Sequence, residues 1–256
     1  MESQEIGLTG GNMSKPVLKD NIVYKDIHPA SPNIHKLLCY VREKGIDWVP
    51  KSYGLSDNRH ALSFITGTVI HDNPKWIFST RTLKECALKL RAWHDATVGF
   101  QQVNDEWLLS NDEPHEVICH NDFAPYNWVF NKQKRVVGLI DFDTCCPGSR
   151  VWDIAYAAYR IVPLMPHDDV SVYYETSPFS YNKMIKRLEL FLKVYSKGQS
   201  SVKYSVESVI GKAQLRLCTI AAWSDTEGTR ANNQELIDHA RMYRLHAEWL
   251  RSKSAR

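Results

Sequence analysis

The chain has 256 residues, of which 43% are hydrophobic and 24% charged, and its formal net charge is +3. This composition is typical of a soluble globular protein with one large domain or two smaller ones, and so small a charge does not indicate nucleic acid or an anionic membrane as a partner. No apolar run approaches the roughly 18 residues that cross a bilayer, and the acidic, polar start lacks the basic residues of a secretory signal.

The cysteines indicate the compartment. Six are scattered along the chain, with no CxxC pair and no regular framework: Cys39, Cys86, Cys119, Cys145, Cys146 and Cys218. In a chain of this size they are interpreted as buried, reduced thiols. A cytoplasmic location is therefore expected.

The first 66 residues are predicted to be rich in short strands. The pair Asp20-Asn21 is a turn signal between two segments with β-branched and aromatic residues. Helical spacing of apolar residues follows, with Ser31 as the expected N-cap and Gly45 at the expected end. The expected elements are strands at 16–18, 22–25 and 61–65 and a helix at 31–44.

Longer helices are expected after residue 66. Thr82 and Glu85 have the spacing of a capping box ahead of an apolar stripe. The other expected elements are strands at 116–119, 128–130 and 136–140, and helices near 152–161, 181–197, 203–223 and 232–252. The sequence therefore predicts an α+β chain with a strand-rich lobe over residues 1–66 and a larger, mainly helical lobe over 67–256.

Three polar residues are placed beside the predicted strands in a way that suits phosphate chemistry. Asp122 and Asp141 each follow an apolar strand, and Asn127 ends the loop that begins near Asp122. Strands deliver side chains to fixed points at their ends. Asp and Asn oxygens suit Mg²⁺, and a carboxylate beside an acceptor hydroxyl can receive its proton during phosphoryl transfer. Lys25, on an early strand, is a candidate to neutralise phosphate oxygens.

These segments resemble a known family. The sequence HNDFAPYN at residues 120–127, followed by IDFD at 140–143, is similar to the catalytic and metal-binding segments of the aminoglycoside phosphotransferase family, also called the phosphotransferase enzyme family. The resemblance runs from about residue 7 to 165 and includes PGSRVWDIA at 147–155. It implies a two-lobed protein-kinase-like fold that binds ATP or GTP with Mg²⁺ at the lobe junction.

The resemblance also implies roles for single residues. Asp122 looks like the catalytic aspartate that accepts the proton of the substrate's hydroxyl group. Asn127 and Asp141 look like metal ligands, and Asp143 is expected either to bind a second metal or to cap a turn. Lys25 resembles the strand lysine that contacts the α- and β-phosphates.

Supporting roles follow in the same way. His120 is expected to hold the geometry of the loop, and Asp153 to brace that loop through backbone hydrogen bonds. The backbone of Ser63, Phe64 and Ile65 resembles the linker that contacts the purine base.

Two departures from the family pattern concern the first lobe. Family members usually carry a glutamate on the first helix that pairs with the strand lysine, but His35 stands near that place. Lys25 is then held by the phosphates or by a different partner. There is also no Gly-x-Gly-x-x-Gly loop, since Gly10-Gly11 offers only a short turn.

The balance of charged residues in the C-terminal part of the chain slightly favours one class of acceptor substrate over another. From residue 160 to the end, fifteen basic residues stand against ten acidic ones, although Asp168, Asp169 and Glu175 could form an acidic rim. Enzymes that bind polycations line the acceptor site with acids. A small metabolite, a sugar-like alcohol or a weakly charged antibiotic is therefore favoured over a typical aminoglycoside.

Two other classes of function stay open. One is a catalytically weak or inactive kinase-like binding protein that acts in regulation or immunity, which the missing glutamate and short phosphate loop favour. The other is a hydrolase with paired carboxylates, which would leave Asn127 and Lys25 without roles.

Overall fold

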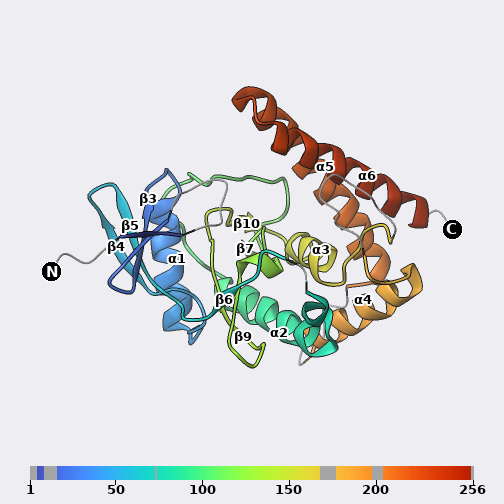
Figure 1. Cartoon of the computed structure of the whole chain (residues 1–256), viewed down its shortest axis with the longest axis horizontal. Helices are drawn as coiled ribbons and strands as arrows, with labels where there is room; N and C mark the ends of the chain where they lie inside the picture. The colour runs from blue at the N-terminus through green and yellow to red at the C-terminus, as the bar shows by residue number, and fades with distance from the viewer. Residues whose placement is uncertain (1–4, 9–15, 73, 168–176, 198–203, 255–256) are drawn as a thin grey trace. The chain divides into compact units, whose positions relative to one another are not determined.

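The computed structural model describes residues 5–8, 16–72, 74–167, 177–197 and 204–254 (Figure 1). Contacts within the chain divide it into two compact units, residues 1–150 and 151–256. The expected lobe boundary at residue 66 falls inside the first unit and stays a prediction. The expected turn at Gly10-Gly11 and the expected acidic rim at Asp168, Asp169 and Glu175 lie outside the described residues.

The first unit contains a five-stranded antiparallel sheet in the order β1-β2-β3-β5-β4. Its strands are β1 (Ile6–Gly7), β2 (Val17–Lys19), β3 (Ile22–Asp26), β4 (Ser52–Ser56) and β5 (Arg59–Ser63). The predicted turn at Asp20-Asn21 is confirmed, because both residues have positive φ angles, 50° and 64°, between paired strands. Asp57-Asn58 forms a similar turn between β4 and β5. Asn and Asp tolerate this left-handed conformation best among residues other than glycine.

Helix α1 (Ser31–Glu43) follows the sheet's third strand and packs an apolar face inward. Ile34, Leu37 and Val41 are buried on that face. The prediction that Ser31 is the N-cap is wrong by one residue, because Ala30 occupies the cap position. The Ser31 hydroxyl instead accepts the His28 backbone N–H at 2.9 Å, which secures the turn that leads into the helix.

Helix α2 (Thr80–Thr97) confirms the predicted apolar stripe but corrects the predicted cap. Ser79 is the N-cap, and its hydroxyl accepts the Thr82 backbone N–H at 3.2 Å. Thr82 is therefore inside the helix. Glu85 does not fold back onto the cap because it forms an ion pair with Arg135 and accepts the Val136 backbone N–H at 3.2 Å.

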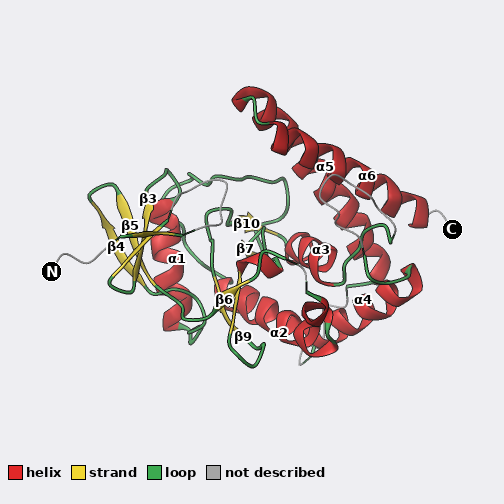
Figure 2. Ribbon diagram, viewed as in Figure 1, coloured by secondary structure: helices red, strands yellow, loops and turns green. Residues whose placement is uncertain are grey.

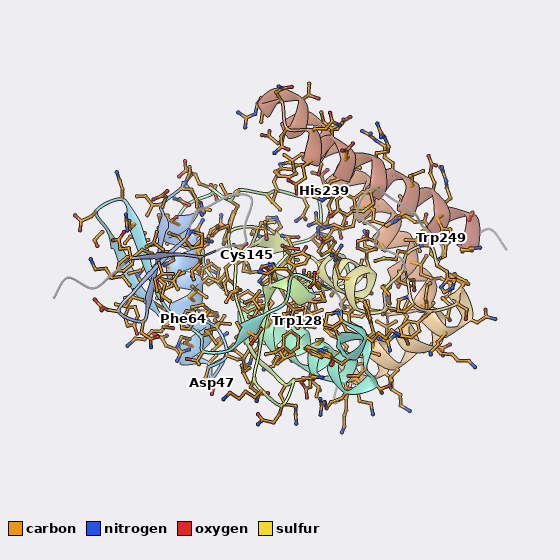
Figure 3. All side chains as sticks on the ribbon, in the orientation of Figure 1. Asp47, Phe64, Trp128, Cys145, His239 and Trp249 are labelled. Carbon is orange, nitrogen blue, oxygen red and sulfur yellow. The ribbon has the colours of Figure 1, made fainter. Side chains whose placement is uncertain are left out.

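Two small sheets complete the first unit and frame a short loop. One pairs β7 (Val117–Cys119) with β10 (Cys146–Gly148), and the other has the order β6-β8-β9. The strands of the second sheet are β6 (Thr68–Val69), β8 (Trp128–Phe130) and β9 (Val136–Leu139). Trp128, labelled in Figure 3, begins β8 and is buried. Short 3-10 helices lie at η1 (Lys75–Phe78) and η2 (Pro125–Asn127).

Every regular element among the described residues of the second unit is a helix, and loops join the helices (Figure 2). The helices are α3 (Arg150–Ile161, which begins at the unit boundary), α4 (Tyr181–Tyr195), α5 (Val206–Ala231) and α6 (Gln234–Ser254). The buried Arg187 guanidinium of α4 donates to the backbone oxygens of Ile161 and Val162 at 3.1 and 3.0 Å, which ties α4 to the end of α3. Within the described residues, no helix is both long and apolar enough to span a membrane. The predicted α+β class is confirmed.

Candidate functional site

The loop between β7 and β8, residues 120–127, is anchored to the segment that follows Asp143. The Asn121 side-chain amide donates to the Thr144 backbone oxygen at 2.9 Å, and the Thr144 hydroxyl donates to the His120 backbone oxygen at 3.0 Å. Asn121 has a φ of 63°, a conformation that non-glycine residues adopt rarely and that Asn tolerates. Two hydrogen bonds with Thr144 therefore hold the start of the loop in place.

His120 is fully buried under this loop. Its Nδ1 atom accepts the Asp122 backbone N–H at 3.3 Å, and its ring lies 5.0 Å from the ring of Phe142 and 6.3 Å from that of Trp93. A ring enclosed by aromatic neighbours stays in one orientation. This placement supports the expectation that His120 holds the loop's geometry.

Asp122 and Asn127 are brought together at the two ends of the loop. The Asn127 amide nitrogen donates to the Asp122 backbone oxygen at 2.9 Å and to the carboxylate Oδ2 at 2.8 Å. The hydroxyl of Tyr126 donates to the other carboxylate oxygen. Sequence reasoning missed Tyr126, although a phenol four residues from the acid in a short loop is a usable signal. These bonds fix the direction of the Asp122 carboxylate.

Asp141 and Asp143 converge on Lys25. The Lys25 ammonium lies 3.0 Å from Asp141 Oδ1 and also forms an ion pair with Asp143 Oδ2. Phe142 between them points into the core, where it is 3% exposed, so the two acids share the opposite side. The Ile140 backbone N–H donates to Asn127 O at 2.9 Å, which places Asn127 beside the residue that precedes Asp141.

The charges in this group shift the pKa values of its members. Burial would lower the pKa of Lys25, but the charges of Asp141 and Asp143 outweigh that effect and raise it. Burial would likewise raise the pKa of Asp143. The hydrogen bond from His28 and the charge of Lys25 outweigh it and lower this pKa to about 2. Asp143 is therefore ionised at neutral pH. His28, whose Nε2 lies 3.4 Å from Asp143 Oδ1, carried no signal in the sequence.

Two backbone amides of the expected base-binding linker form hydrogen bonds within the protein. The Ser63 backbone N–H donates to Lys51 O at 2.8 Å, and that of Phe64 (labelled in Figure 3) donates to Asn21 O at 3.1 Å. These two amides are thus used within the first sheet. Ile65 follows directly, and its methyl groups lie 2.7 and 2.9 Å from where a Cβ on Gly138 would stand. Glycine at 138 is what allows this close approach.

A small cluster of polar side chains stands near the place where family members have the helix glutamate. His35 on α1 contacts the Ser52 hydroxyl at 2.7 Å, and the same hydroxyl contacts His60 Nε2 at 2.7 Å. His60 is paired with Lys25 across strands β3 and β5. Burial, and then the nearby His35, lower the pKa of His60 to about 4, so its ring is neutral at pH 7. In place of a helix glutamate, Lys25 pairs with the two acids Asp141 and Asp143.

The low pKa of His60 predicts a pH-dependent stability. The unfolded chain takes up this proton below pH 6.5, but the folded chain only below about 4. The free energy of unfolding should therefore fall as the pH falls through this window, by up to about 3 kcal/mol from this group. Urea unfolding at several pH values should show that the free energy of unfolding falls less with falling pH in His60→Gln than in the unmodified chain. The exposed His115→Gln is the control, and an equal loss in all three proteins would refute the assignment.

The available donors suit Mg²⁺ held together with phosphates and water. Within the described part of the chain, no group of three or more His, Cys, Asp or Glu side chains gathers as a metal site. Asp141 and Asp143 already bind one cationic group, the Lys25 ammonium, in common. Mg²⁺ is usually bound by one or two carboxylates and completes its shell with water and substrate phosphates. The two acids with Asn127 fit that pattern.

Asp153, expected to brace the loop, lies on α3 and is fully buried. Its bracing role stays a prediction.

The sequence of this chain is similar to that of a known protein family. Residues 58–180 match the profile of the phosphotransferase enzyme family, a range that includes the loop and both strand-terminal acids. The resemblance to this family is confirmed.

The individual proteins that this chain resembles have low sequence identity to it. The trifolitoxin immunity protein of Rhizobium leguminosarum bv. trifolii is 29% identical over 174 residues, and the match covers 65% of each chain, just under two thirds of that relative's length. An ethanolamine kinase of Plasmodium vivax has a TM-score of 0.69 at 14% identity, covering 98% of this chain and 84% of the other. An APH(2")-IIa structure with gentamicin has a TM-score of 0.57 at 16% identity, covering 94% and 91%. These two structures show the protein-kinase-like fold.

Proposed function

We propose that this chain is a small-molecule kinase that transfers the γ-phosphoryl group of ATP or GTP to a hydroxyl group of a small metabolite or antibiotic. The proposal rests on two groups of side chains that both lie within the first unit. Asp122 is held by Asn127, while Asp141 and Asp143 converge on Lys25. A set of turn-capping residues would have no need of this convergence.

Each residue has a distinct part in the proposed transfer. Asp122 orients the acceptor hydroxyl and takes its proton, because its carboxylate is aimed by Tyr126 and Asn127. Asn127, Asp141 and Asp143 would hold Mg²⁺, which when bound supplies positive charge at the phosphate oxygens. Lys25 would contact the α- and β-phosphates.

The rest of the site would bind and support. The first lobe, residues 1–66, would bind the nucleotide, with the purine base against the backbone of Ser63, Phe64 and Ile65. Residues 67–256 would bind the acceptor and carry out catalysis, with His120 and Asp153 in support. All six cysteines are free thiols, which supports a cytoplasmic location for this activity.

The acceptor is proposed to be a hydroxylated compound of low charge. The neighbouring folds include an ethanolamine kinase and an aminoglycoside-bound enzyme, so small amino alcohols and antibiotics are both candidates. The excess of basic residues after residue 160 disfavours a polycation.

A second candidate function is supported by the relative from Rhizobium. That protein is named for immunity to a toxin, and the missing helix glutamate suits a kinase-like protein that binds without turnover. The two candidates differ in a simple way, because only the first requires transfer of phosphate to an acceptor.

Nucleotide binding gives the first test. A nucleotide with Mg²⁺ at roughly 100 times its dissociation constant should stabilise the chain by about 2.7 kcal/mol, which corresponds to a rise in Tm of roughly 5–10 °C. Thermal unfolding should be followed with ATP and with GTP, each with Mg²⁺ and with a chelator. An unchanged Tm with both nucleotides would contradict the proposed function.

A further inference from the structure

Lys25 occupies the carboxylate oxygens that the proposed function assigns to a metal ion. Its ammonium contacts both Asp141 and Asp143, and its side chain is only 12% exposed. The two acids lie 116 and 118 residues away in sequence, so the fold brings them to the lysine. The contact is a specific ion triad in which Lys25 and Asp143 are largely buried and the Asp141 side chain is 35% exposed.

The surroundings of Lys25 explain why it turns to these acids. On the sheet beside it stands His60, which is neutral at pH 7, and behind His60 are Ser52 and His35. A family glutamate would hold the lysine on that side. Without it, the nearest negative charges are the acids proposed to bind metal.

A divalent cation at the same oxygens would come within a few ångströms of the Lys25 ammonium. Like charges at such distances repel strongly where water is scarce. The lysine and the metal therefore cannot both keep their full contacts with Asp141 and Asp143. Phosphate groups offer the lysine another partner of opposite charge.

We propose that Lys25 competes with the metal ion for Asp141 and Asp143, so that metal binds well only together with a nucleotide whose phosphates draw the lysine away. This inference rests on the proposed function. It makes metal and nucleotide binding positively coupled, and the coupling is reciprocal.

The competition can be measured without turnover. Mn²⁺, as a probe for Mg²⁺, would be titrated by calorimetry into the full chain without nucleotide, for the unmodified protein and for Lys25→Met. The variant should bind Mn²⁺ at least about tenfold more tightly, a difference of about 1.4 kcal/mol. Lys19→Met is the matched control, because Lys19 is on the neighbouring strand and pairs with the exposed Glu5. The control should bind as the unmodified protein does.

Other results would overturn the proposal. Equal or weaker Mn²⁺ binding by Lys25→Met, in a variant that unfolds cooperatively, would show that the lysine does not compete. If Lys25→Met fails to fold, the proposal can still be tested on the unmodified chain. Its Mn²⁺ affinity should rise at least about tenfold with a non-hydrolysable nucleotide, and an unchanged affinity refutes the coupling. If the unmodified chain and Lys25→Met bind Mn²⁺ equally and Asp141→Asn does not bind it, only the proposed competition is refuted. If the unmodified chain binds no Mn²⁺ even with nucleotide, the proposed metal site is refuted as well.

Discussion

Replacing Asp122 by asparagine is expected to slow phosphoryl transfer by roughly 10²–10⁴-fold. Asparagine has the same shape but cannot accept the proton of the acceptor hydroxyl. The local hydrogen bonds can survive the change, because the new amide oxygen can accept from Asn127 and the Tyr126 hydroxyl can turn to accept from the new amide nitrogen. Nucleotide affinity should therefore stay close to that of the unmodified chain.

The two effects need separate measurements. Transfer would be followed by the appearance of phosphorylated acceptor, and nucleotide affinity by thermal unfolding with nucleotide and Mg²⁺. Asp112→Asn is a suitable control, since Asp112 is exposed and lies before β7. A fully active Asp122→Asn protein would rule out the proposed proton acceptor.

Replacing Asp141 by alanine is expected to remove most of the metal-dependent part of the nucleotide-induced rise in Tm. The carboxylate is one of two that converge on a cation at this point, and removing it leaves only Asp143 and Asn127 as protein donors. Loss of one of so few ligands weakens Mg²⁺ binding strongly, because Mg²⁺ demands near-ideal octahedral geometry.

The comparison that matters is the difference in Tm between nucleotide with Mg²⁺ and nucleotide with a chelator. In Asp141→Ala this difference should nearly vanish. In Asp47→Ala, which removes an exposed acid labelled in Figure 3, it should stay as in the unmodified chain. An undiminished difference in Asp141→Ala would show that the metal is held elsewhere.

Local patterns in the sequence predicted the helices and the strands that flank the loop, but not the strands β1, β4, β6 and β10. The Asp20-Asn21 turn, the stripe of α2 and the strands around residues 120–127 all follow from short-range signals. Strand β4 was missed because Ser-Tyr-Gly-Leu-Ser lacks clear alternation of apolar residues. The cap of α2 was misplaced because two hydroxyl residues, Ser79 and Thr82, both had the chemistry for it.

The partner of Lys25 could not be predicted from local pattern. The absence of a helix glutamate showed only that the usual partner was missing. Asp141 and Asp143 reach Lys25 through tertiary folding over more than a hundred residues, and His28 adds a contact to Asp143 that no motif announces. Long-range electrostatic pairing of this kind depends on the packed structure rather than on spacing along the chain.

Movement of a labelled γ-phosphoryl group tests the proposed kinase activity most directly. The full chain would be incubated with γ-labelled ATP or GTP, Mg²⁺ and a panel of acceptors that includes amino alcohols, sugar-like alcohols, aminoglycosides and less charged antibiotics. The proposed function predicts label on the hydroxyl of at least one acceptor, dependent on the divalent metal and lost in Asp122→Asn. Nucleotide binding with no label on any acceptor would contradict it and would favour the kinase-like binding protein.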